Sequence, residues 1–307
     1  MTFYLNEDIL ATVGQKTEER TGQVTAYAIR KFCAAIDERA PVYLDKEAAR
    51  AAGYADVISP PLFNASVLRP VPHRDGLLND GQYGDLAPAG LGHLQTMLAG
   101  HNWESHRPAI AGEHIRQVTT IKSISEREGK TGPILFTERE SIIETLDGEP
   151  LERYSNVLIL RAPPPPLPAF EGRAGGPATS PHFAATSWQD GKLIKRPDMI
   201  QLFMFSAAIW AVHRIHWDTP YAQSEGLKLP VLPGWMLSCY LSQIASAKAP
   251  AGQRIRSLEH RYRASGFPGD TVICSTREDA EPGAIEVVAE NQDGAVLVTG
   301  TTRFTDC

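Results

Sequence analysis

The sequence predicts two consecutive α+β units, and three observations support this fold class. Runs of alternating or β-branched residues, separated by hairpin signals, follow one another in both halves of the chain. Helix-like segments precede those runs in each half, which is the order typical of an α+β unit. The two halves also match each other without gaps at an offset of 173 positions, which places Phe32 on Phe205 (205 − 32 = 173).

Composition bounds the class of protein. The 307 residues, 42% hydrophobic and 21% charged, are typical of one or two ordinary globular domains. A net charge of −6 gives no electrostatic case for a nucleic-acid partner. No signal peptide and no window of roughly 18 apolar residues for a membrane span is evident. The four cysteines lack CxxC spacing. We therefore expect a cytoplasmic protein with no metal site, no cofactor and no membrane partner.

The first half is expected to be helical at its start and β-rich at its end. Helical patterns cover residues 7–21, 27–35 and 46–52, the last closed by Gly53, and an apolar run follows at 62–71. Residues 72–90 are rich in Gly, Pro and Asp and are predicted to form a long loop. From Gly92 onward the pattern changes to strands. The clearest of these lie at 114–125, 132–145 and 150–161.

A proline- and glycine-rich segment divides the chain. Residues 162–182 contain four consecutive prolines and then a Gly-rich part, which is typical of a linker. We therefore expect one domain at 1–161 and another at 183–307. In the second, one or two strands are predicted within 183–195, then helix and turn. A helix begins near Gly234, and four strands follow at 254–263, 270–277, 284–290 and 295–304.

Residues 202–242 carry the functional signal. His213 and His216 lie among apolar residues, and Pro233–Gly234 precedes an apolar, helix-compatible segment. A backbone N–H at a helix start has no intrahelical partner, so Gly234 can donate to a ligand oxygen. A base and an oxyanion donor are two parts of a carbonyl-activating site.

The internal match shows that the first half lacks both groups. Opposite His216 lies Tyr43, whose phenol has a pKa of about 10 and is a poor base at neutral pH. Opposite Gly234 lies Pro61, which has no N–H. We therefore expect the reactive groups in the second half and a pocket shaped by the first.

These residues resemble the hydratase motif of the MaoC-like hot-dog proteins, which include (R)-specific enoyl-CoA hydratases and 3-hydroxyacyl-thioester dehydratases. Four residues fall at the family's spacings: His216, Asp218, Gly234 and Ser242. The first half is similar to the degenerate dehydratase domain of double members. The resemblance implies a double hot-dog fold, in which each sheet wraps one central helix, at Leu62–Val71 and at Gly234–Ala247. The two sheets would join edge to edge.

The chain departs from the family at three positions, one of which is Pro233, in place of a polar residue that often precedes the helix Gly. Ala211 stands where the family has its acid/base Asp, and His213 stands where an Asn is usual. The sequence HRIHWD is most similar to the subgroup of type-2 3-hydroxyacyl-thioester dehydratases and mesaconyl-C4-CoA hydratases, which also lack that Asp. Glu38, opposite Ala211 in the repeat, is expected to lie far from His216.

The resemblance implies a cofactor-free hydro-lyase. The Gly234 N–H would polarise a thioester carbonyl, and His216 would transfer both protons or share them with His213. Asp218 is a candidate for catalysis or for helix capping. Candidate substrate-binding residues are Ser242, Trp235, Arg214 and Trp217.

The resemblance also sets the expected partners and leaves two alternatives. We expect an acyl thioester of coenzyme A or of an acyl carrier protein as substrate, and a homodimer. The first alternative is a dehydratase, isomerase or cyclase of a natural-product pathway, favoured by the aromatic residues around the motif. The second is a non-catalytic acyl-thioester-binding subunit, favoured by the missing Asp.

Overall fold

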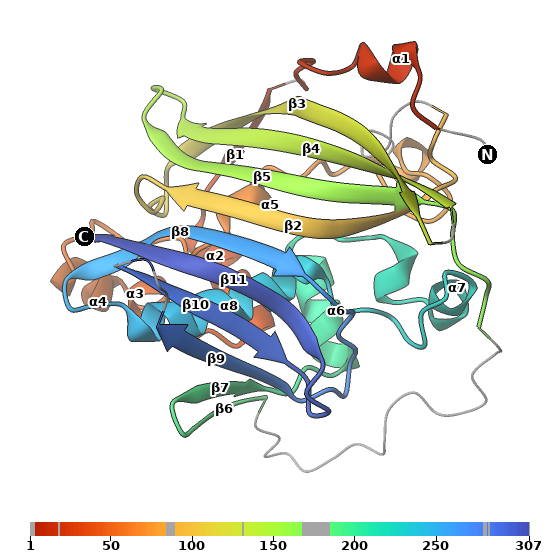
Figure 1. The fold of residues 1–307 in the computed structure, drawn as a ribbon. Helices are drawn as coiled ribbons and strands as arrows, with labels where there is room; N and C mark the ends of the chain where they lie inside the picture. Colours follow the sequence, from red (N-terminus) through yellow and green to blue (C-terminus); the bar gives the residue numbers. More distant parts are fainter. Residues whose placement is uncertain are drawn as a thin grey trace.

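A single antiparallel sheet runs through both halves of the chain (Figure 1). The computed structural model describes residues 4–17, 19–83, 90–130, 132–167, 185–278, 281 and 283–306. In this part of the chain the sheet has the order β1-β3-β4-β5-β2-β8-β11-β10-β9-β7-β6. Of the predicted linker at 162–182, residues 168–182 lie outside the described residues.

The predicted strands are confirmed. Those of the first half are β2 (Gln95–Ser105), β3 (His114–Gly129), β4 (Gly132–Thr145) and β5 (Pro150–Arg161), and a further strand that was not predicted is β1 (Arg20–Gln23). Those of the second half are β6 (Thr186–Gln189), β7 (Lys192–Lys195), β8 (Gln253–Tyr262), β9 (Val272–Glu278), β10 (Ala284–Glu290) and β11 (Val296–Asp306). Strands β2 and β8 join the halves, with His101 opposite His260 and Trp103 opposite Leu258. The expected edge-to-edge junction is therefore present.

The helix predicted over residues 7–21 is wrong beyond its first turn. Helix α1 covers only Glu7–Leu10. Gly14 has a φ of +85°, and its N–H donates to Ile121 O at 2.8 Å, while the Thr17 N–H donates to Thr119 O at 2.8 Å. The chain therefore runs alongside β3, because pairing with a sheet edge satisfies backbone groups that a short exposed helix would leave to water.

The helices repeat at the same offset as the sequence. Helix α2 (Ala26–Ile36) corresponds to α6 (Met199–Ala208), and α4 (Lys46–Ala51) to α7 (Thr219–Ser224), since 199 − 26 and 219 − 46 both equal 173. The short α3 (Pro41–Leu44) corresponds to the 3₁₀ turn η2 (Arg214–His216). The helices α2 and α6 also end in the same way. Asp37 follows α2 with a φ of +48°, and Trp210, 173 positions later, follows α6 with a φ of +55°. The internal duplication is therefore structural as well.

The two copies diverge after residue 61 and its counterpart at 234. Helix α8 (Gly234–Lys248) has 15 residues and confirms the helix expected at Gly234–Ala247, whereas α5 (Asn64–Val67) has only four. The central helix expected at Leu62–Val71 is therefore wrong. Pro70 and Pro72 cannot donate a helical N–H, and each disfavours helical geometry in the residue before it. Among the residues described between α5 and β2, the one helical element is the short η1 (Arg74–Gly76).

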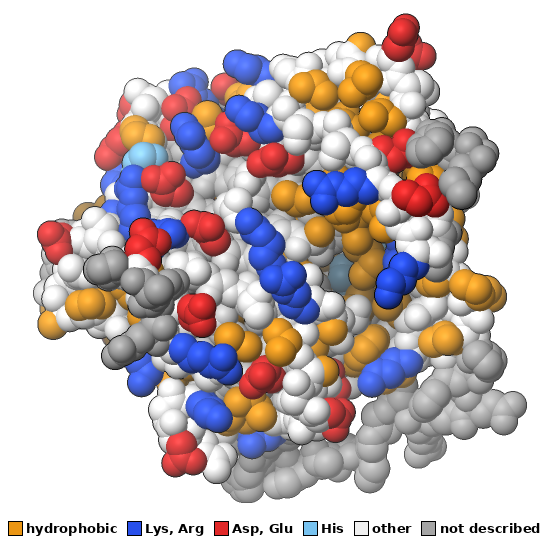
Figure 2. Space-filling model, viewed as in Figure 1, with side chains coloured by type: hydrophobic (Ala, Val, Ile, Leu, Met, Phe, Trp, Pro, Cys, Tyr) orange, Lys and Arg blue, Asp and Glu red, His pale blue; other side chains and the backbone are white. Residues whose placement is uncertain are grey.

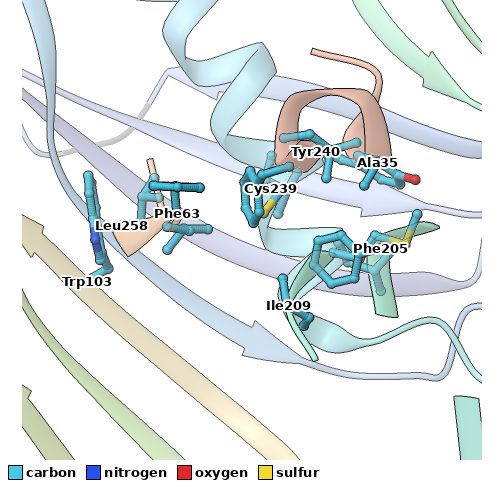
Figure 3. Packing of buried hydrophobic residues seen from close by; sticks show 14 of the residues in the cluster. Ala35, Phe63, Trp103, Phe205, Ile209, Cys239, Tyr240 and Leu258 are labelled. Carbon is cyan, nitrogen blue, oxygen red and sulfur yellow. The ribbon is translucent and has the colours of Figure 1, made fainter. Parts of the chain in front are cut away.

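Helix α8 and its sheet form the main core. The helix is buried along most of its length, and its side chains pack with those of α2, α6 and the second-half strands. Figure 3 shows Cys239 and Tyr240 of α8 near Ala35 of α2, and Phe63 near Leu258. None of the helices in the described ranges has the length and apolar character needed to span a bilayer.

Candidate active site

A cavity of about 520 Å³ lies where the two halves meet, and both halves line it. The first half contributes the inner face of its sheet. The second half contributes residues 209–216 without Trp210 and Arg214, residues 231–237 without Met236, and residues 262–266. Figure 2 shows a hollow in one face of the molecule, with apolar walls, a histidine side chain in its depth and Lys or Arg side chains around its rim. The volume is in the range of small-molecule sites.

His216 lines this cavity in a form suited to act as a base. Its Nδ1 lies 2.8 Å from the carbonyl oxygen of Val231. Because a carbonyl only accepts, Nδ1 carries the proton and Nε2 carries the lone pair. Burial lowers the pKa of His216 to about 4, and the Val231 carbonyl offsets only part of that effect. The ring is therefore neutral at pH 7, with Nε2 as its basic nitrogen.

Gly234 begins α8 at the wall of the same cavity. Pro233 precedes it as the cap, without a side-chain hydrogen bond to the helix. Within the described ranges, no acceptor is found for the Gly234 N–H. A Cβ at this position would come within 2.8 Å of the Tyr262 ring, so glycine lets the ring cover the helix start. The free N–H and the positive end of α8 make this position suited to a ligand oxygen.

His213 lies beside His216, immediately before the 3₁₀ turn that carries it. The two ring centroids are 6.0 Å apart with perpendicular planes, and both rings line the cavity. Nε2 of His213 lies 3.6 Å from Oδ2 of Asp80 and 3.3 Å from Nε2 of Gln82. The sequence does not indicate Asp80, which belongs to the predicted loop 72–90, of which residues 84–89 lie outside the described residues.

Several contacts hold the Asp80 carboxylate in place. Gln82 donates to it twice, from its backbone N–H at 2.9 Å and from Nε2 at 2.9 Å, and the Tyr221 hydroxyl lies at 3.4 Å. Burial alone would raise the pKa of Asp80, but the hydrogen bonds from His213 and Gln82 outweigh it and lower the pKa to about 2. Asp80 is therefore ionised at neutral pH, next to His213.

The loop that carries Asp80 is docked tightly on the second half. The Arg214 N–H donates to Asp80 O at 2.8 Å, and the Tyr83 hydroxyl donates to Trp210 O at 2.5 Å. Gly81 has a φ of +85°, and a Cβ there would lie 2.4 Å from Val212 O. Only glycine fits this approach, so the first half contributes a positioned carboxylate to the site.

Four predicted site residues lie outside the cavity lining in the structure. Asp218 caps α7 and forms an ion pair with Arg214 at 2.6 Å. The Trp217 ring is 52% exposed and donates from Nε1 to Val212 O, and the Ser242 hydroxyl donates to Cys239 O within α8 at 2.8 Å. These contacts are structural. The structure brings together the other four: His213, His216, Gly234 and Trp235.

Two further groups border the site without any signal in the motif. Arg69 lies over the rings of Tyr83 and Trp235, at 5.5 and 5.4 Å from their centroids, and donates from Nε to Ile209 O. The Tyr262 hydroxyl is 2.6 Å from the Ser238 hydroxyl, which in turn lies 2.8 Å from Nδ1 of His260. This chain of contacts fixes the ring that covers Gly234.

The comparisons with known proteins agree with this architecture. The family model of the FAS1-like dehydratase domain region matches residues 11–153. A UPF0336 protein of Saccharopolyspora erythraea is 35% identical over 43% of this chain and 78% of its own length. The mesaconyl-C(4)-CoA hydratase of Chloroflexus aurantiacus is 28% identical over 81% of this chain and 85% of its own length.

Solved structures show the same fold. A MaoC-like dehydratase superposes with a TM-score of 0.73 at 16% identity, covering 97% of this chain and all of the other. A Mycobacterium tuberculosis protein described as a double hotdog fold gives a TM-score of 0.61 at 13% identity, covering 95% and 96%. The predicted double hot-dog fold is confirmed.

The chain belongs to the same family as the UPF0336 proteins, and it has the double hot-dog fold of the MaoC-like dehydratases. The general class of activity that these relatives support is that of a hydro-lyase.

Proposed function

We propose that the protein adds water to, or removes it from, the double bond of an enoyl or 3-hydroxyacyl thioester of coenzyme A. The observation that carries this proposal is the presence of the His216 ring and the Gly234 N–H on the wall of one cavity. Residues 183–307 supply both groups, and residues 1–161 shape the cavity and supply Asp80.

The chemistry balances without any redox partner. In hydration, the water oxygen bonds to C3 while Nε2 of His216 takes the water proton. The electron pair of the C2–C3 double bond shifts toward the thioester carbonyl, whose developing charge the Gly234 N–H stabilises. The pair then returns to C2 and binds a proton, so one water has been added. Dehydration is the reverse sequence.

The proton for C2 has two candidate donors. His216 carries the proton that it took from water and can return it to C2. His213, 6.0 Å away between ring centroids and in contact with ionised Asp80, is a second acid next to the same cavity. The Asp80–His213 pair thus stands in for the family's Asp, which is Ala211 here. Asp80 does not line the cavity and acts as a positioning residue.

Coenzyme A is the carrier that the cavity favours. Arg161 and Arg263 line it, and neither forms an ion pair with a carboxylate among the described residues. Two such guanidinium groups suit the phosphates of coenzyme A. A relative that spans most of the chain is named as a hydratase of a CoA thioester. We also propose a homodimer, for which the solution mass is expected to be twice the chain mass of 33.6 kDa.

Turnover of enoyl-CoA thioesters tests the function. We expect the purified protein to consume enoyl-thioester absorbance, and His216→Gln to reduce the rate by about 10²–10⁴-fold, because it removes the positioned base. His93→Gln is the matched control, since His93 is exposed and lies outside the cavity lining. Absence of turnover on every enoyl-CoA, or turnover that survives in His216→Gln, would reject the proposal.

A further inference from the structure

Helix α6 exposes only apolar side chains to solvent. Its inner side contributes Leu202 and Phe205 to the main core, where Figure 3 shows Phe205. The exposed residues of α6 follow one another at intervals of three and four along one face of the helix, and they are Ile200, Phe203, Met204 and Ala207. These four residues form the α6 stripe. Because a surface helix normally carries polar or charged residues on its outer face, such a stripe indicates a face that another molecule covers.

The duplicated helix α2 carries different residues at the same positions. At the offset of 173, the α6 stripe corresponds to Tyr27, Arg30, Lys31 and Ala34, all of which are exposed. Arg30 and Lys31 are charged, so this face of α2 is suited to contact with water. The same face of the repeated helix is therefore polar in the first copy and apolar in the second. The architecture of the repeat does not by itself account for the apolar stripe.

The α6 stripe is large enough to form the centre of a stable interface. Ile200 is 69% exposed, Phe203 68% and Met204 39%, and none of them lines the active-site cavity. Complete coverage of the stripe would bury about 400 Å² on each molecule, since a large side chain presents roughly 150–250 Å². Two copies would bury about 800 Å² in this way. A polar rim around such a centre brings the total to about 1,200 Å², where stable interfaces begin.

A second copy of the chain fits the α6 stripe better than a charged partner does. Helix α6, with the sequence MIQLFMFSAA, contains neither Lys or Arg nor Asp or Glu. An acidic carrier protein or an anionic membrane surface would require cations within the stripe. A contact between two identical apolar faces needs no exchange of charge, and a twofold axis brings the same face of both copies together. Arg30 and Lys31 of α2 then stay at the polar rim, since the Phe32 and Phe205 ring centroids of the two helices are 6.0 Å apart.

We infer that the homodimer forms through the α6 stripe, with α6 of one copy packed on α6 of the second copy across a twofold axis. This inference rests on the homodimer proposed together with the function, and it does not depend on the proposed reaction. Phe203, in the middle of the stripe, provides a large apolar contact. The segment that carries His213 and His216 follows α6 directly, so the dimer also fixes the helix from which that segment departs.

Exchange of residues between the two copies tests the interface. The mass of the full chain is measured by sedimentation equilibrium over a range of protein concentrations. We expect twice the chain mass of 33.6 kDa for the unchanged protein, and a single chain mass for the variant that combines Phe203→Arg with Met204→Lys. The reason is that each copy would bring two cations without partners into the contact. Because α2 already carries Arg30 and Lys31 at the same positions, this double variant is expected to fold.

A milder variant and a matched control accompany the double variant. Phe203→Ala removes an apolar contact without adding charge, and it is expected to raise the dissociation constant of the dimer about tenfold or more. It keeps a readout if the double variant unfolds. The control combines Arg30→Gln with Lys31→Gln, at the same two positions of α2, and is expected to leave the mass at two chains. Circular dichroism checks that each variant is folded.

The outcomes separate the interface from the other proposals. A dimer that persists unchanged in the double variant and in Phe203→Ala would overturn the α6 interface and leave the homodimer standing. A single chain mass for the unchanged protein at every concentration would overturn both, while turnover of enoyl-CoA thioesters would still decide the hydro-lyase proposal. Binding of phosphatidylglycerol vesicles by the unchanged protein, lost in the double variant, would assign the stripe to a membrane and overturn the inference. A dimer that is lost in the double variant, weakened in Phe203→Ala and kept in the control supports it.

Discussion

The two halves of the molecule begin alike and end differently. Up to residues 61 and 234 the same helices occur at the same offset, with matching caps and matching positive φ values after α2 and α6. Beyond that point one copy has a 15-residue helix on its sheet and the other has a four-residue turn and a long loop. The two copies of a duplicated unit can therefore take different roles. One copy keeps the candidate reactive groups, and the other lacks the central helix and leaves a cavity in its place.

Among the variants that compare the two copies, the largest effect is expected from placing the first copy's proline in the second copy. Gly234→Pro removes the N–H proposed to bind the thioester oxygen, while proline is tolerated at the first position of a helix. Loss of one oxyanion donor costs about 10²–10³-fold in kcat. Gly234→Ala is the matched control, because it keeps the N–H but meets the same Tyr262 ring, at 2.8 Å from its Cβ. Equal kcat values for the two variants, measured with enoyl-CoA, would show that the N–H has no role.

The contribution of the first half to the chemistry is tested next. Asp80→Asn removes the charge beside His213 and is expected to lower kcat by up to about 10²-fold, because a misoriented group loses its attack geometry. If Asp80 acts through His213, the pH profile of kcat is expected to shift in Asp80→Asn. If Asp80 has only a structural role, the pH profile is expected to stay the same. Asp75→Asn, at an exposed residue of the same loop, is the control. An unchanged pH profile in Asp80→Asn would exclude the positioning role.

The stability of the protein in acid is expected to depend on three buried histidines that lie where the two halves meet. Burial lowers the pKa of His101 and His216 to about 4 and that of His260 to about 3. Below about pH 6.5 the unfolded chain therefore binds protons that the folded chain does not, so the free energy of unfolding falls as the pH drops from about 6.5 toward 4.

A variant pair checks this pH dependence. His260→Gln is expected to reduce the slope of the free energy of unfolding by about 1.4 kcal/mol per pH unit, measured by urea denaturation between pH 4.5 and 6.5. Ser238→Ala removes the same 2.8 Å contact but no titrating group, so its slope is expected to match that of the unchanged protein. A slope unaltered in His260→Gln would contradict the assignment.

The smallest effect is expected at the counterpart of the proposed base. Tyr43 lies opposite His216 in the repeat, outside the cavity lining, and its hydroxyl contacts Ser246 of α8. Tyr43→Phe should change kcat less than twofold and lower stability by about 1 kcal/mol, the cost of one hydrogen bond. A large loss of activity in this variant would mean that the two copies share the chemistry after all.

Much of the fold could be predicted because its signals are local. Alternating patterns and turn residues identified the strands other than β1, and the internal match identified the duplication. The helix over residues 7–21 was wrong because pairing of Gly14 and Thr17 with β3 is a tertiary contact that no local pattern shows. The family resemblance implied a central helix at Leu62–Val71. This prediction was wrong, because Pro70 and Pro72 disfavour a helix there and α5 has only four residues.

Part of the candidate site could also be predicted from signals that are local in the sequence. His213, His216 and Gly234 are close in sequence and lie on one cavity, so their spacing was informative. Asp80 lies 133 residues before His213 (213 − 80 = 133), on a loop with no motif, and only the folded chain brings them together. The polar side chains of β3, β4 and β5 that line the cavity, such as Thr119, Ser141 and Tyr154, were also missed. Alternation along these strands predicts a sheet face but does not show that a cavity lies over it.

The seam between β2 and β8 has a consequence for how the chain can be divided. Five residue pairs, from Gly100–Arg261 to Glu104–Ser257, connect the halves there, and each strand has its other edge paired within its own half. Separately produced fragments 1–161 and 183–307 would each present a bare strand to solvent and would tend to aggregate. When the two fragments are co-expressed, β2 of one and β8 of the other are expected to pair again. Folding would then require that both fragments are present together rather than that they are covalently linked.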